Sequence, residues 1–70
     1  MGKKWDKVVI DRDEFRRMIA QSGYTLAGLS REAGYDVSLA SRMLSQGSGN
    51  YMTLDEFCTR CNRRVEDVMA

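Results

Sequence analysis

Cys58 and Cys61 are the residues of this 70-residue chain whose spacing most directly suggests metal or redox chemistry. A structural zinc site needs four ligands, but the chain holds two cysteines and no histidine. A redox-active thiol gains its low pKa at a helix N-terminus, whereas both cysteines fall on the apolar face inside an expected helix. We therefore interpret them as small buried residues of a reduced, cytoplasmic protein, and we expect neither a metal nor a cofactor.

Catalysis has little support from the other polar residues. Histidine, the commonest general base, is absent, and no acid or base stands at a recognisable catalytic spacing from the serines, which include Ser30, Ser38, Ser41 and Ser45. The glycines of segment 47–49 lack the preceding strand and the following lysine of a phosphate-binding loop. We expect the protein not to be an enzyme.

The segment 25–47 has instead the pattern of two short helices joined by a tight turn. The Thr25 hydroxyl can cap the first helix, and Gly34 suits the left-handed backbone that often follows a helix end. Asp36 or Ser38 can cap the second helix. Its buried face is predicted by three residues at the i, i+3, i+4 spacing, namely Ala40, Met43 and Leu44.

The opposite face of this second helix is short and polar, as a helix that reads the major groove of DNA requires. Four of its residues are candidates for facing the base edges: Val37, Ser38, Ser41 and Arg42. A valine methyl can meet a thymine methyl, a serine hydroxyl can serve several bases, and the Arg42 fork can bind either guanine or phosphate.

The chain resembles the phage-repressor and Cro-type helix-turn-helix regulators, in their small stand-alone versions. Their motif residues appear here in order as Thr25, Leu29, Ser30, Gly34, Ser41, Arg42, Leu44 and Gly47. The segment 53–69, TLDEFCTRCNRRVEDVM, is similar to the continuation TLDKICKALNC-IEDIM of small members. Leu26 stands where relatives often have a glutamine that touches phosphate, Gly28 replaces a helix-stabilising acid, and Gln46 stands where asparagine is frequent.

The resemblance implies an all-α fold, a five-helix lambda-repressor-like DNA-binding bundle with a short extended N-terminal arm. Residues 1–10 would form the arm, and 11–70 a single helix-turn-helix domain. The implied function is a sequence-specific regulator of transcription, a repressor, that binds double-stranded DNA. The residues expected to face phosphate are Thr25, Leu26, Ser45, Gln46, Ser48, Asn50 and Tyr51.

The remaining segments predict the elements around this motif. The β-branched segment 5–10, which includes Trp5, is expected to be extended, and Asp11 with Glu14 predicts a helix start. Segment 47–52 is expected to be a loop. Thr53 with Glu56 predicts the start of the fourth helix, and a last short helix follows, with apolar residues Val65, Val68 and Met69.

Composition limits the partners. The net charge of +1 is lower than is common for a DNA-binding domain, which leaves an alternative: a protein-interaction module, antitoxin-like or anti-repressor, that uses the same bundle without DNA. No membrane span and no small-molecule effector is evident. One reading helix contacts few base pairs, so we expect a homodimer, with segment 5–10 as the candidate contact.

Overall fold

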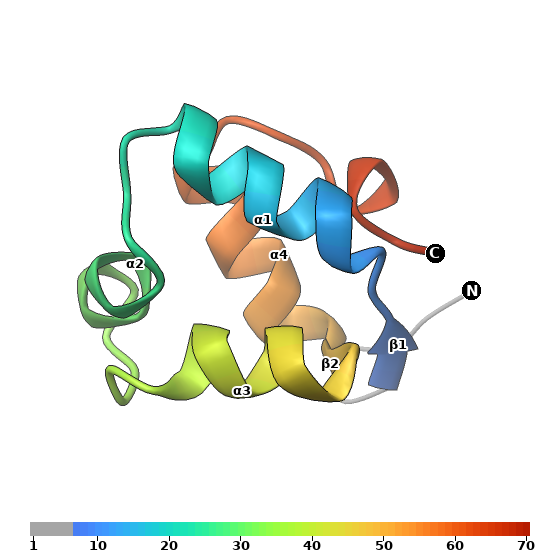
Figure 1. Cartoon of the computed structure of the whole chain (residues 1–70), viewed down its shortest axis with the longest axis horizontal. Coiled ribbons are helices and arrows are strands. Elements are labelled where there is room, and N and C mark those ends of the chain that lie inside the picture. The colour runs from blue at the N-terminus through green and yellow to red at the C-terminus, as the bar shows by residue number, and fades with distance from the viewer. Residues whose placement is uncertain (1–6) are drawn as a thin grey trace.

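Short helices and one small sheet make up the part of the chain that the computed structural model describes, residues 7–70. The elements run in the order β1 (Lys7–Val9), α1 (Arg12–Gln21), α2 (Leu26–Glu32), α3 (Leu39–Gln46), β2 (Ser48–Asn50), α4 (Tyr51–Arg60) and the 3-10 turn η1 (Val65–Asp67). Figure 1 shows α4 crossing behind α1 in the middle of the molecule, with α3 below it and α2 seen end-on at the left. The sheet closes the opposite end.

The expectation of an all-α, five-helix bundle is wrong, because part of the expected N-terminal arm belongs to a sheet. Residues 7–9 are extended, as predicted, but β1 pairs antiparallel with β2 in the register Lys7↔Asn50, Val8↔Gly49 and Val9↔Ser48. An extended segment leaves backbone N–H and C=O groups without partners. Residues 48–50, which lie inside the loop predicted at 47–52, supply those partners. The expected fifth helix is the three-residue turn η1. The fold is therefore a mixture of α and β, and Trp5 lies outside the described residues.

Helix starts follow from side chains that accept backbone N–H bonds. The Asp11 carboxylate accepts from Glu14 N at 3.2 Å and the Thr25 hydroxyl from Gly28 N at 2.9 Å, so both predicted caps are confirmed. The predicted cap of α4 at Thr53 is wrong, because Asn50 Oδ1 accepts from Met52 N at 2.9 Å and starts the helix earlier. The cap is thus the last paired residue of β2.

The core lies where α1, α4 and the turn between α2 and α3 meet. Phe57 of α4 is fully buried, with its ring centroid 6.3 Å from that of Phe15 and 5.8 Å from that of Tyr35, which it meets edge-on. Both cysteines are buried in the same core. Tyr35 therefore joins the turn to the core.

The C-terminal residues close the fold against β1. Ile10 bridges Met69, Asp11 N donates to Val68 O at 2.8 Å, and Ala70 N donates to Val9 O at 3.0 Å. The strand β1 is thus flanked by β2 on one side and by segment 68–70 on the other.

Replacing Phe57 with alanine should lower the free energy of unfolding by about 3–5 kcal/mol, because a large side chain is removed from a fully packed site. The measurement is chemical or thermal denaturation followed by circular dichroism. Met52→Ala is the matched control, since Met52 lies on the same helix but is 46% exposed. Equal melting of Phe57→Ala and the parent would contradict the observed packing of α4.

Candidate nucleic-acid interface

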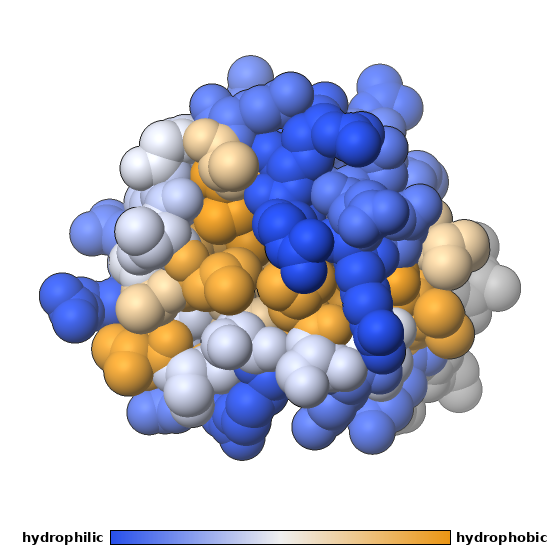
Figure 2. All heavy atoms as spheres, viewed as in Figure 1, coloured by the Kyte–Doolittle hydropathy of each residue, from blue (hydrophilic) through white to orange (hydrophobic). Residues whose placement is uncertain are grey.

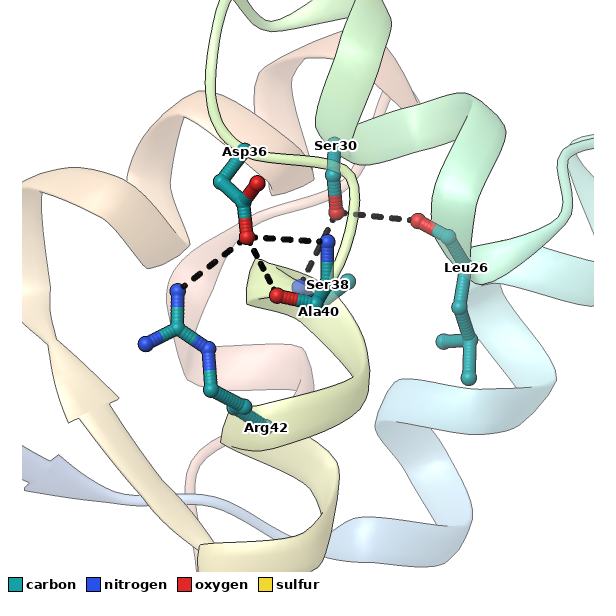
Figure 3. A network of polar contacts seen from close by, with 6 residues as sticks. All are labelled: Leu26, Ser30, Asp36, Ser38, Ala40 and Arg42. Carbon is teal, nitrogen blue, oxygen red and sulfur yellow. Dashed lines mark hydrogen bonds and ion pairs between the residues drawn. The ribbon is translucent and has the colours of Figure 1, made fainter.

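The hydroxyl of Ser30 fixes the position of α3 relative to α2. Ser30 is completely buried, donates to Leu26 O at 2.9 Å and accepts from Ala40 N at 2.9 Å (Figure 3). The first N–H groups of a helix have no partner within the helix, and Ser38 at the start of α3 makes no side-chain cap bond. Ser30 therefore caps α3 from the neighbouring helix.

Gly34 carries the turn between the two helices. Its φ of 85° is left-handed, as predicted, and the following Tyr35 N donates to Ser30 O at 2.9 Å. The turn therefore brings α2 and α3 into direct packing contact. The prediction of two short helices joined by a tight turn in segment 25–47 is therefore confirmed.

Asp36 organises the start of α3. Its Oδ2 accepts from the Ser38 hydroxyl and from Ser38 N, the latter at 3.3 Å, and lies 3.6 Å from Arg42 Nη2 (Figure 3). The hydrogen bond from the Ser38 hydroxyl, followed by that from the Ser38 backbone, holds the pKa of Asp36 below its ordinary value. Asp36 is therefore a carboxylate at neutral pH, with Ser38 and Arg42 as its partners.

The outer face of α3 and of the turn before it is exposed. Val37 is 44% exposed, and the side chains of Ser38, Ser41 and Arg42 also face solvent. Ala40 and Met43 are buried and Leu44 is half-buried. The structure therefore exposes all four residues predicted to face bases, with Val37 and Ser38 just before α3 and Ser41 and Arg42 on it.

A hollow of about 160 Å³ lies between this face, the sheet and the start of α4. It brings together four of the predicted contact residues, namely Arg42, Gln46, Ser48 and Asn50. Lys7 and Thr53 line the same hollow and are not among the residues predicted from the sequence. Among the described residues of its lining, two are cations and none is an acid, so the hollow suits an anion.

The other predicted phosphate contacts do not line this hollow. The Thr25 hydroxyl is engaged in capping α2, and Leu26 and Tyr51 are half-buried against the core. Ser45 is exposed, and its carbonyl accepts from Arg12 Nη2 at 3.1 Å. Arg12 thus places a cation at the C-terminal end of α3, where it complements the helix dipole.

Lys7 reaches the hollow through the pairing of β1 with β2. Local sequence patterns carry no signal for this placement, because the paired residues lie far apart in the chain.

Cys58 and Cys61 are free, buried thiols. Burial, and then the neighbouring Cys61, raise the pKa of Cys58 to about 12, so it carries its proton at neutral pH. Within residues 7–70 no group of three or more His, Cys, Asp or Glu residues could hold a metal ion. Every helix in this range is also too short or too polar to cross a membrane.

Comparison with known proteins identifies no matching family model, curated relative or solved structure. The geometry of α3 and of the adjoining hollow is therefore the basis for any statement of function.

Ser30→Ala should lower the free energy of unfolding by about 1–3 kcal/mol, because the buried Ala40 N–H loses its acceptor. Urea denaturation of the variant and the parent measures the difference. Ser22→Ala is the control, because the exposed Ser22 hydroxyl also donates to a carbonyl four residues earlier, Met18 O, but caps no other helix. A Ser30→Ala loss no larger than that of the control would show that the bridge does not fix α3.

The native thiols should react slowly with iodoacetamide at neutral pH, because both are buried and Cys58 is a neutral thiol. Both should react rapidly in denaturant, where they are exposed. The unfolded chain releases the Cys58 proton near pH 9.0 and the folded chain near 12, so stability should fall as the pH rises between these values. Mass spectrometry follows the labelling. Equal labelling rates in the native and unfolded states would contradict the burial.

Proposed function

We propose that the protein binds double-stranded DNA sequence-specifically, with α3 in the major groove, and acts as a transcriptional repressor by occupying its site. The observation that carries the proposal is the short polar face of α3 beside a hollow lined by the cations Lys7 and Arg42. An exposed helix of this length enters the major groove, and cations at its edge suit the phosphates that border the groove.

The ion pair between Arg42 and Asp36 is compatible with this function. Its side chains are 58% and 66% exposed, and an exposed pair contributes little to stability. Arg42 can therefore leave Asp36 for a phosphate or a guanine at small cost. The low net charge of +1 also argues less strongly against DNA binding, because the described lining of the hollow contains no Asp or Glu.

A two-fold dimer through β1 extends the proposal. Val9 of β1 is 64% exposed and Met69 beside it is 39% exposed. Figure 2 shows apolar surface at the right of the molecule, where β1 lies in Figure 1. Burial of this apolar surface against a second copy would supply a two-fold dimer, the form in which helix-turn-helix proteins bind two half-sites about 34 Å apart.

Arg42→Ala should weaken DNA binding. The preferred site is first selected from a random duplex library and then titrated by fluorescence anisotropy at two salt concentrations. If Arg42 binds phosphate, the variant should bind all DNA sequences more weakly, and the slope of log affinity against log salt concentration should fall in magnitude by about 0.9. If it reads guanine, the loss should be about 1–3 kcal/mol and confined to the selected site.

Arg60→Ala is the matched control, since it removes the same charge from the far end of α4, away from the hollow. It should bind the selected site nearly as the parent does. Equal affinities of the parent, Arg42→Ala, Ser38→Ala and Ser41→Ala would exclude α3 as the reading helix. A parent without DNA affinity would favour the protein-interaction module instead.

A further inference from the structure

The contact between Ser38 and Asp36 fixes the direction in which the Ser38 hydroxyl can hydrogen-bond. A free serine hydroxyl donates one hydrogen bond and accepts others, so it discriminates weakly between bases. Here the Ser38 hydroxyl donates to Asp36 Oδ2, and the Ser38 backbone N–H donates to the same oxygen. Figure 3 shows both contacts on the side of α3 that also carries Arg42.

Asp36 is a partner that can only accept. Its pKa lies below the ordinary value for aspartate, which is already acidic, so Asp36 is ionised at neutral pH and has no proton to donate. A hydrogen bond from a hydroxyl to a carboxylate is roughly twice as strong as one between neutral groups. A neutral acceptor on a base therefore competes poorly with Asp36 for the hydrogen bond that the Ser38 hydroxyl donates.

The lone pairs of the Ser38 oxygen remain available, and the side chain is exposed. A base that brings an N–H donor can bond to this oxygen without breaking the contact with Asp36. A base that brings an acceptor meets only the lone pairs of Ser38 and the negative charge of Asp36, which repel it.

We propose, on the basis of the DNA-binding function above, that the Asp36–Ser38 pair selects a base with an exocyclic amine, adenine or cytosine, at the position Ser38 faces. Adenine N6 and cytosine N4 present donors in the major groove, whereas guanine O6 and thymine O4 present acceptors. Ser38 is the contacting residue in this arrangement, and Asp36 is the positioning residue.

The test compares four duplexes that carry the selected site and differ only at the base pair facing Ser38, which is located as the position whose preference changes in Ser38→Ala. The parent should bind adenine and cytosine duplexes about 3- to 10-fold more tightly than guanine and thymine duplexes, as expected for one hydrogen bond. Ser38→Thr should keep this preference. Asp36→Ala should reduce it to within about 2-fold, because the freed hydroxyl can then donate or accept.

Asp55→Ala is the matched control for charge, because it removes an exposed aspartate from α4 and leaves Ser38 and Asp36 in place. It should keep the base preference of the parent. A parent preference for guanine or thymine, or an unchanged preference in Asp36→Ala, would overturn the inference. If no position changes its preference in Ser38→Ala while one position loses its amine preference in Asp36→Ala, the inference is also overturned, since Asp36 would then contact the base itself.

A second measurement needs no DNA. Carbon-detected NMR titration of the Asp36 carboxyl should show a pKa below the ordinary value in the parent and a higher pKa in Ser38→Ala, with no such rise in Ser41→Ala. An unchanged Asp36 pKa in Ser38→Ala would overturn the inference even if the protein binds DNA. If the titration behaves as expected but no DNA sequence is preferred, the proposed function fails, and the inference fails with it.

Discussion

The hydroxyl of Ser30 is the interaction on which the arrangement of the two central helices depends. It satisfies the carbonyl of Leu26 in its own helix and the N–H of Ala40 in the next, and it is completely buried. A buried polar group needs partners, and the Ala40 N–H reaches the Ser30 hydroxyl only when α3 lies where it does. Because α3 has no cap bond from Ser38, the same contact serves as its helix cap and as its anchor to α2. The start of α3 is consequently free to hold the exposed set of Asp36, Ser38 and Arg42.

The sheet lines the side of the hollow that faces α3. The pairing of Lys7 with Asn50 brings a cation from the start of the described chain to the end of α3, where Arg42 and Gln46 line the same hollow. Gly49 packs closely against the side chain of Met43, since a Cβ at position 49 would lie 2.5 Å from Met43 Cε and would require that side chain to move. The strand segment that replaces the expected loop is thus fixed by a close approach to the buried face of α3.

Features that depend on a few neighbouring residues could be predicted from the sequence. The caps at Asp11 and Thr25, the left-handed Gly34 and the exposed face of α3 are all of this kind, because each follows from local hydrogen bonding or helical spacing. The pairing of β1 with β2 could not be predicted in this way, since its partners lie far apart in the chain. The start of α4 was ambiguous locally, because Asn50 and Thr53 are both good caps, and the strand partnership of Asn50 decides between them. The hydrogen bonds from Ser38 to the Asp36 carboxylate could not be predicted either, because they depend on side-chain geometry in the turn.

The contact of segment 68–70 with β1 has a consequence for how the chain folds. Loop-closure entropy makes contacts between distant residues slow to form, whereas α2 and α3 are neighbours in sequence and can associate early. During synthesis on the ribosome, Val68 and Ala70 emerge long after Val9 and Asp11, to which they hydrogen-bond. Throughout that interval the outer edge of β1 lacks the partner that covers it in the native fold, and an uncovered strand edge can pair with another chain. The helix pair that carries the proposed reading face can thus form before this edge of β1 is covered.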